Sequence, residues 1–276
     1  MDITTIGIDL AKNSFALVGM NKHGKIVFRK TLTRNKLLAF IAQCPPCLIG
    51  MEACSGAHYW GREFTKLGHR IGIIAAKFVE PFRKGAKNDN NDAEAICEAV
   101  LRPNIWFVPI KSPDQQAVLC IHRVRQGLVR DRTSMMNQLR GLLSEFGIIM
   151  PKGRYPAQAA IAGILEEAEN SLPMIARRVI DNLWQRIKQA NEQIEGYNRE
   201  LAQLVKESTV ARQIMTIPGV GAQTASGVVA SVADPRMFKN SRQFSAWLGL
   251  VPRQYTTGGK IKRSEEHTSE LQSHLN

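Results

Sequence analysis

The order of apolar segments in the first hundred residues constrains the fold of this chain more than any other feature. Three strand-like segments come first, at 3–8, 14–20 and 26–31, and residues 21–25 have the composition of a hairpin turn. Helix-like and strand-like segments then alternate, which indicates parallel pairing. The expected elements are a helix after Thr33, a strand at 47–52, a helix at 56–67, a strand at 70–75, a helix at 91–101 and a closing segment at 106–110. This order predicts an α/β fold of the ribonuclease H-like kind.

Four acidic residues lie in contexts that a solvated charge would not favour. Asp9 and Glu52 each end an apolar strand-like run, and Asp89 and Asp92 lie three apart near the start of a helix. A carboxylate at the tip of a buried strand is partly desolvated, and a divalent cation usually offsets that cost. Oxygen ligands from separate elements suit Mg²⁺ or Mn²⁺. Such ions hold the attacking and leaving oxygens of a phosphodiester. We therefore expect metal-dependent phosphoryl transfer on nucleic acid.

The predicted order of strands and helices brings these four acids to one region of the fold. Asp9 and Glu52 are expected side by side at one sheet edge, with Asp89 and Asp92 facing them from a covering helix. An alternative for the helical pair stays open, in which Asp89 is an N-cap and Asp92 complements the helix dipole.

The charge of the chain indicates a polyanionic partner. It has 37 Lys and Arg against 24 Asp and Glu, a formal net charge of +13, which favours binding to nucleic acid through counterion release. A merely basic housekeeping protein stays open. No apolar run approaches the ~20 residues that cross a bilayer, so no membrane association is expected. The five cysteines form no disulfide framework, which favours a reducing cytoplasm.

The middle of the chain is predicted to be a long helical hairpin. Residues 113–148 have a helical composition and a dense set of basic residues, of which Arg123, Arg125 and Arg130 are candidate nucleic-acid contacts. Lys12, close after Asp9, is another candidate, although a solvated hairpin lysine explains it equally well. From Ala176 the apolar positions alternate in steps of four and three, which predicts a coiled-coil seam. An intramolecular antiparallel pair and a dimer contact both stay open.

The last third carries a second motif. Residues 217–225 read Ile-Pro-Gly-Val-Gly-Ala-Gln-Thr-Ala, the form of a helix-hairpin-helix turn. Its glycines allow backbone amides at a helix N-terminus to approach a phosphate. Gly219, Gly221 and Thr224 are therefore candidate contacts to a nucleic-acid backbone. The alternative is a tight connection between two helices.

Several motifs together resemble the insertion-sequence family one hundred and ten, especially its eleven-eleven subgroup. The matching pieces are Gly7-Ile8-Asp9-Leu10-Ala11-Lys12, Met51-Glu52-Ala53, Asn88-Asp89 with Asp92-Ala93, Pro218-Gly219-Val220-Gly221 and Gly249-Leu250-Val251-Pro252-Arg253. The resemblance implies a DEDD transposase that excises and inserts a mobile element and works as a homodimer or higher homo-oligomer with a structured bridge RNA. It implies a RuvC-like domain over 1–110, a helical coiled-coil segment over 111–210 and a small, mostly helical C-terminal transposase domain over 211–262.

The resemblance also assigns roles to residues. Asp9, Glu52, Asp89 and Asp92 correspond to the metal-binding tetrad. The family's serine nucleophile falls where this chain has Thr256 and Thr257, and a threonine hydroxyl belongs to the same chemical class. We expect Thr257, then Thr256, to replace it, with Arg253 and Lys260 near the nucleic acid. Two other functions stay open: a RuvC-like nuclease or Holliday junction resolvase that forms no covalent product, and a decayed, non-catalytic DNA-binding relative.

Residues 263–276 differ in character from the rest. The stretch from Arg263 to Ser273 resembles an in-frame translation of a short-read sequencing adapter. We therefore expect a non-native, disordered tail and a reading frame cut near Lys262.

Overall fold

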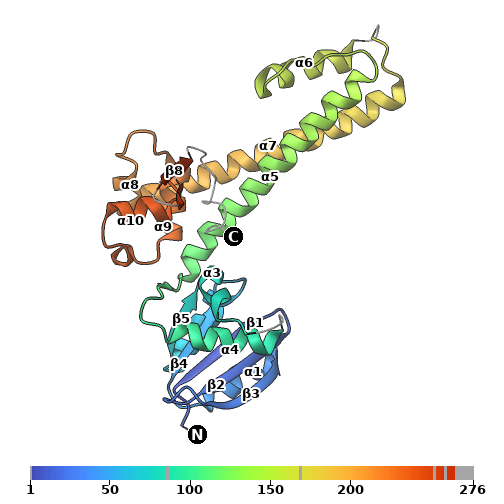
Figure 1. The fold of residues 1–276 in the computed structure, drawn as a ribbon. Coiled ribbons are helices and arrows are strands. Elements are labelled where there is room, and N and C mark those ends of the chain that lie inside the picture. The colour runs from blue at the N-terminus through green and yellow to red at the C-terminus, as the bar shows by residue number, and fades with distance from the viewer. Residues whose placement is uncertain (1, 85–87, 168–169, 251–252, 258–259, 265–276) are drawn as a thin grey trace. The chain divides into compact units, whose positions relative to one another are not determined.

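The computed structural model divides the chain into two compact units, Met1–Ser112 and Pro113–Asn276 (Figure 1). It describes residues 2–84, 88–167, 170–250, 253–257 and 260–264. The first unit is α/β, and the second consists of helices and one β-hairpin. No helix in these described ranges combines the length and the apolar composition needed to cross a bilayer.

A six-stranded mixed sheet forms the centre of the first unit, in the order β3-β2-β1-β4-β5-β6. The strands are β1 (Thr5–Leu10), β2 (Ser14–Met20), β3 (Ile26–Thr33), β4 (Leu48–Glu52), β5 (Arg70–Ile74) and β6 (Phe107–Val108). β1, β2 and β3 pair antiparallel, β4 and β5 run parallel to β1, and β6 is antiparallel to β5. The predicted α/β class, with three antiparallel strands before the alternating part, is confirmed.

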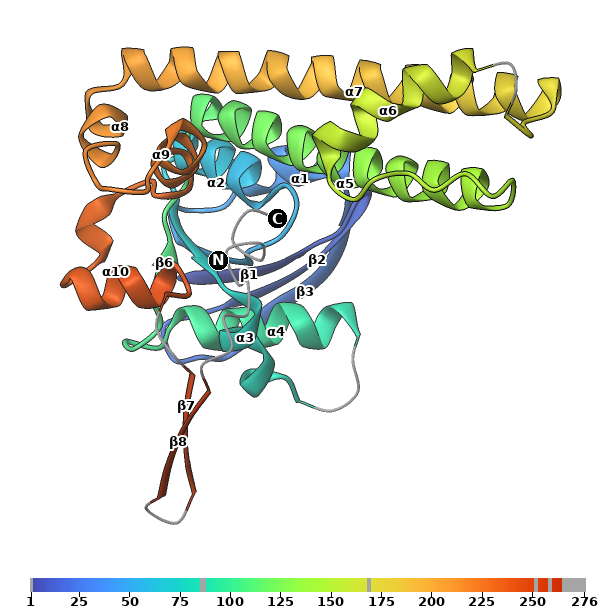
Figure 2. The same cartoon turned by 90° about the horizontal axis from the view of Figure 1, so that it is seen from above.

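Helices cover both faces of this sheet (Figure 2). α1 (Arg34–Ala42) and α2 (Ala57–Lys66) lie on one face, and α4 (Asp89–Val100) crosses the other. The short helix α3 (Ala76–Val79) and the 3-10 turn Glu80–Phe82 precede α4.

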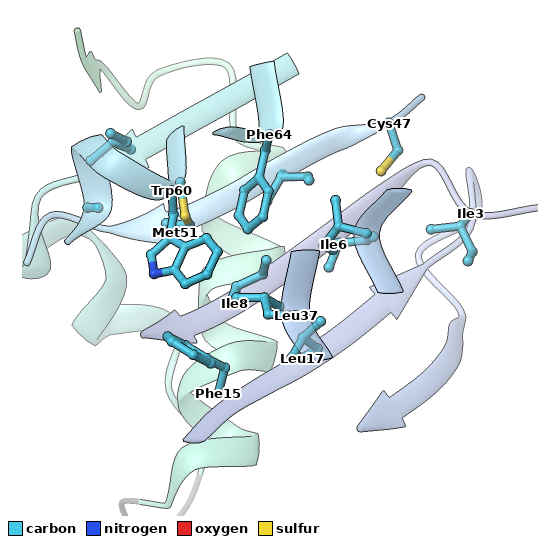
Figure 3. Close-up of a cluster of buried hydrophobic side chains, with 14 residues drawn as sticks. Ile3, Ile6, Ile8, Phe15, Leu17, Leu37, Cys47, Met51, Trp60 and Phe64 are labelled. Atoms are coloured by element: carbon cyan, nitrogen blue, oxygen red, sulfur yellow. The ribbon is translucent and has the colours of Figure 1, made fainter. Parts of the chain in front are cut away.

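The main core fills the space between the sheet and the α1/α2 layer. Ile6 and Ile8 of β1 point to this side and are fully buried, and Trp60 and Phe64 of α2 close over them (Figure 3). Side chains alternate along a strand, so Thr5, Gly7 and Asp9 of β1 take the opposite side, toward α4. Each large apolar side chain buried here stabilises the unit by about 1.5–3 kcal/mol.

Three glycines in one row allow α4 to approach the sheet closely. Gly7, Gly50 and Gly72 are register partners on the adjacent strands β1, β4 and β5. A Cβ at Gly7 would lie 2.2 Å from the carbonyl oxygen of Ala93, and one at Gly72 would lie 2.6 Å from Val100 Cγ2. Any side chain in this row would therefore push the helix away from the sheet.

The second unit is built on an antiparallel helix pair, α5 (Pro113–Ser144) and α7 (Met174–Glu207). Two hydrogen bonds set its register: Arg125 Nε donates to Asn198 Oδ1 at 2.6 Å, and Arg132 Nη1 donates to Asn191 Oδ1 at 3.3 Å. Most of the predicted apolar positions of α7 are buried along this pair, and Ala176, Tyr197 and Leu204 are half-buried. The buried positions include Ile180, Leu183, Ile187, Ala190, Ile194 and Leu201.

Smaller elements pack at the two ends of the pair. α6 (Arg154–Glu166), which the sequence did not predict, packs at one end, and α8 (Thr209–Ile214) and α9 (Ala222–Ser231) pack at the other. α10 (Ser241–Trp247) and the hairpin of β7 (Arg253–Thr257) and β8 (Lys260–Ser264) follow. Of the predicted disordered tail, Arg263 and Ser264 belong to β8, and 265–276 lie outside the described residues.

Substitution of Gly7 tests the close approach of α4. Gly7→Ala is expected to lower the free energy of unfolding of the first unit by about 3 kcal/mol, because the new methyl group overlaps the α4 backbone. Gly196→Ala is the matched control. No atom outside its own helix lies within 4 Å of a Cβ at that position of α7, so a gain of about 0.5–1 kcal/mol is expected. Urea unfolding followed by circular dichroism measures both. A Gly7→Ala protein as stable as the wild type would contradict the packing.

Candidate active site

The face of the sheet that α4 covers also carries the two strand-end carboxylates. Asp9 lies two residues beyond Gly7, and Glu52 lies two residues beyond Gly50, so both point to the α4 side. Ile8 and Met51 are partners in the parallel pairing of β1 with β4, so the next residues, Asp9 and Glu52, stand on adjacent strands at the same level. Both are half-buried. The sheet thus brings together two carboxylates that lie 43 positions apart in the sequence.

The pKa of a nearby thiol, that of Cys54, depends on the charge of this pair. Cys54 follows β4 and is exposed. Desolvation by neighbouring groups, and then the negative charges of Glu52 and Asp9, raise the pKa of the Cys54 thiol to about 11. Both carboxylates act on this one thiol, as expected for charges on two adjacent strand ends.

The third acid, Asp92, lies on the inner side of α4. It is only 8% exposed, and its Oδ1 accepts a hydrogen bond from Nε of Arg83 at 2.5 Å. Arg83 directly follows the 3-10 turn, so the chain supplies a cation to this carboxylate just before the helix that carries it. Such a charge-assisted contact offsets much of the cost of burying Asp92.

The fourth acid, Asp89, is the first residue of α4 and is exposed. The helix N-cap is Asn88, whose Oδ1 accepts a hydrogen bond from the Asn91 amide at 2.9 Å. The alternative assignment of Asp89 as the N-cap is therefore wrong, although both acids lie in the first turn, where they complement the helix dipole.

The chemical type of the donor atoms fits a hard divalent cation. Asp9, Glu52 and Asp92 offer carboxylate oxygens from β1, β4 and α4, the ligands that Mg²⁺ and Mn²⁺ prefer. In the described part of the chain, no three His, Cys, Asp or Glu side chains converge closely enough to hold a metal ion. Asp92 contacts Arg83 instead. The contact with Arg83 is made by Oδ1 of Asp92, one of its two carboxylate oxygens.

The candidate nucleic-acid contacts are found in both units. Lys12 is exposed between β1 and β2, three residues after Asp9. On α5, Arg123 and Arg130 are exposed. Arg125 is half-buried and donates to Asn198 of α7, so at least part of its role is to join the two helices.

The glycine-rich turn connects α8 to α9. Gly219 has φ +82°, a left-handed conformation that favours glycine, and Gly221 is the N-cap residue of α9. Thr224 is exposed in the first turn of α9. The neighbouring Gln223 donates from Nε2 to Asn198 Oδ1 at 2.9 Å, the same oxygen that Arg125 contacts. This shared acceptor ties the start of α9 to the helix pair.

The proposed nucleophiles belong to the C-terminal hairpin. The backbone of Thr256 pairs with Ile261, and that of Thr257 pairs with Lys260 at the end of β7. Arg253 opens the same strand, opposite Ser264. The glycines at 258–259, between the two strands, lie outside the described residues.

Two residues of the carboxylate region were not predicted from the sequence. Arg83 could have been found, because it lies in a short basic stretch only six residues before Asp89. Cys54 carries no such signal, since a cysteine two residues after Glu52 matches no pattern of a hard-metal site.

Comparison with known proteins shows which family the chain belongs to. Residues 6–148 match the DEDD transposase family of IS110 elements, and residues 211–276 match the family described as Transposase IS116/IS110/IS902. The chain is 45% identical to the transposase for insertion sequence element IS1328 of Yersinia enterocolitica, and 43% identical to a probable family 20 transposase of Pseudomonas aeruginosa. It is 37% identical to the transposase for insertion sequence element IS1111A of Coxiella burnetii. Each alignment spans 94% of this chain, and covers 77%, 77% and 71% of the three relatives in that order.

The α/β unit with its strand-end carboxylates, together with these matches, defines a DEDD-type transposase, a DNA-processing enzyme of a class that normally uses a divalent metal ion. The chain belongs to the IS116/IS110/IS902 transposase family. The predicted family is confirmed.

The thiol of Cys54 allows a direct test of the carboxylate pair. Asp9→Asn and Glu52→Gln each remove a negative charge that raises the thiol pKa, so each is expected to increase the thiolate fraction at pH 8.5. Alkylation of Cys54 by iodoacetamide should then be about two- to fivefold faster. Peptide mass spectrometry measures the rate, with the exposed Cys120 as internal reference.

Asp2→Asn is the control, because it removes an equal charge from an exposed position outside the pair. A Cys54 to Cys120 ratio that is the same in all four proteins would contradict the juxtaposition.

Proposed function

We propose that this chain cuts and rejoins DNA strands at the ends of an insertion sequence and at its target, by metal-dependent phosphoryl transfer. The observation that carries the proposal is the placement of Asp9 and Glu52 on one face of two adjacent parallel strands, below the helix that carries Asp92. Family membership supports the same chemistry.

Asp9, Glu52, Asp89 and Asp92 are the proposed ligands. The all-oxygen donor set favours Mg²⁺, with Mn²⁺ as a substitute. When bound, the metal ion supplies Lewis-acid stabilisation of the charge that develops on the phosphate oxygens. Asp9 and Glu52 hold their positions through the sheet register, and Asp92 through α4. Arg83, once released from Asp92, carries a guanidinium suited to a DNA phosphate.

Thr257 is the proposed nucleophile, with Thr256 as the second choice. Its hydroxyl oxygen forms a bond to phosphorus, the bond from phosphorus to one deoxyribose oxygen breaks, and that oxygen leaves with a proton. The hydroxyl proton passes to solvent or to a neighbouring base. Rejoining reverses the exchange with a different sugar hydroxyl as the attacking group. Pairing of Thr257 with Lys260 at the end of β7 supports a phosphate close to this strand end.

The nucleic acid is proposed to contact both units. The candidate contacts are Lys12, Arg123, Arg125, Arg130, Gly219, Gly221, Thr224, Arg253 and Lys260. The exposed arginines of α5 and the amides at the start of α9, a helix-hairpin-helix in this proposal, support sequence-independent backbone binding. A structured guide RNA is a second proposed partner beside DNA, because the net charge of +13 favours binding of polyanions in general.

The helix pair of the second unit is proposed to be an antiparallel coiled coil within one chain. Its seam residues on α7 are already buried against α5, so they are not free to form a dimer contact. A homodimer or higher homo-oligomer, which recombination of two element ends favours, therefore needs another surface.

The metal-dependent step can be tested by removing one strand-end carboxylate. Asp9→Ala is expected to reduce Mg²⁺-dependent cleavage of DNA that carries the element ends by at least about a hundredfold. Asp2→Ala, at an exposed position, should leave the rate unchanged. Strand cleavage is measured on denaturing gels with and without a chelator. An Asp9→Ala protein that cleaves DNA at the wild-type rate would contradict the proposed site.

A covalent product distinguishes a transposase of this type from a resolvase. Denaturation of a stopped reaction should leave labelled DNA attached to the wild-type protein, because the threonine oxygen replaces a sugar oxygen on phosphorus. Thr257→Ala should lose this product and Thr256→Ala should keep it. Thr257→Ser should also form the product, since the primary hydroxyl of serine is a less crowded nucleophile. Metal-dependent cutting with no attached DNA in any of these proteins would favour a RuvC-like nuclease.

A further inference from the structure

A cavity on the helical pair carries an arrangement of charges that the proposed active site does not use. It has a volume of about 230 Å³ and lies entirely within the second unit. Five of its lining residues form one stripe of α5, because they follow one another at alternating steps of one and three positions. The lining residues are Arg132, Thr133, Met136, Asn137 and Arg140, with Gly153 from the segment before α6.

The cavity is strongly cationic. Two of its six lining residues are arginines and none is acidic. The amide of Asn137 and the hydroxyl of Thr133 add neutral polar groups. A partly enclosed space with two guanidinium groups and no carboxylate favours an anion.

The arginines are held in place by other parts of the unit. Nη1 of Arg140 donates to Asn137 Oδ1 at 3.2 Å, and Nη2 donates to the carbonyl oxygen of Gly153 at 3.2 Å. Arg132 is held from α7 through its contact with Asn191. Both side chains are therefore oriented before any ligand arrives, which lowers the entropy lost on binding.

One donor of this arrangement has no acceptor. Nε of Arg140 is buried and makes no hydrogen bond in the described structure. A buried donor without a partner costs free energy, and native structures rarely tolerate one without a reason. An oxygen of a bound anion would satisfy it, as a third acceptor beside Asn137 Oδ1 and the Gly153 carbonyl oxygen.

We propose that this cavity, the Arg132/Arg140 pocket, binds a backbone phosphate of nucleic acid. Phosphate oxygens match the planar donor array of arginine, and a phosphodiester keeps its charge at any physiological pH. The choice of nucleic acid as the source of the phosphate rests on the proposed function, whereas the anion site itself rests on the cavity alone. The pocket fixes the α5–α7 pair on the nucleic acid at a point separate from the glycine-rich turn.

The test compares charge-matched variants of the full chain. Arg140→Gln and Arg132→Gln each remove one charge from the pocket, and Arg199→Gln removes one from an exposed position of α7 outside it. Fluorescence anisotropy measures binding to a labelled DNA duplex and to an RNA hairpin over a range of salt concentrations. Circular dichroism establishes that each variant keeps its helices.

Both pocket variants are expected to weaken binding of at least one nucleic acid about threefold or more beyond Arg199→Gln. The slope of log affinity against log salt should fall by about one, the loss of one phosphate contact. Pocket variants that match Arg199→Gln in affinity and slope, with intact helices, would overturn the proposal.

A second arm distinguishes free phosphate from nucleic acid. The melting temperature of the wild type is measured in inorganic phosphate and in chloride at equal ionic strength. Stabilisation by phosphate that is lost in Arg140→Gln supports the anion site. If that stabilisation is seen while the pocket variants bind nucleic acid like Arg199→Gln, the nucleic-acid source is overturned. A wild type that binds neither DNA nor RNA would instead contradict the proposed function.

Discussion

The close contact between α4 and three glycines of the sheet is the constraint on which the rest of the first unit depends. At Gly7 a Cβ would meet the backbone of α4, and at Gly50 and Gly72 it would meet the side chain of Val100, in each case at 3.0 Å or less. This row of glycines thus fixes where α4 crosses the sheet, on the face that also carries the strand-end carboxylates. Asp9 and Glu52 lie one side-chain repeat past that row, roughly 7 Å farther along their strands.

This arrangement concentrates negative charge in an otherwise basic protein. The chain has a net charge of +13, yet two carboxylates share one strand edge. Desolvation, and then the charges of these two carboxylates, raise the pKa of the adjacent Cys54 to about 11. Asp92 avoids the same cost through Arg83. A site of this kind gains most from a bound cation, because the cation offsets a repulsion that the fold imposes.

Much of the first unit could be predicted because its signals are local. Apolar runs and a turn gave the strands, and the strand-end acids were visible without any structure. The close approach of α4 was not predicted, since it depends on three glycines from three distant segments coming into register. The contact between Arg83 and Asp92 depends on a turn whose geometry the sequence does not reveal. The Arg132/Arg140 pocket needs Gly153, which α6 and its preceding loop bring to α5, and α6 itself carries no clear periodic signal. Its arginines were seen only as part of a basic stretch.

The central claim is that Asp9 and Glu52 bind one divalent cation together. Anomalous diffraction from crystals of the protein grown with Mn²⁺ tests it most directly, because the signal locates the metal without reference to activity. We predict a peak between these two carboxylates, within about 2.0–2.3 Å of an oxygen from each. A saturated crystal with no peak there, or with Mn²⁺ bound only elsewhere, would contradict it.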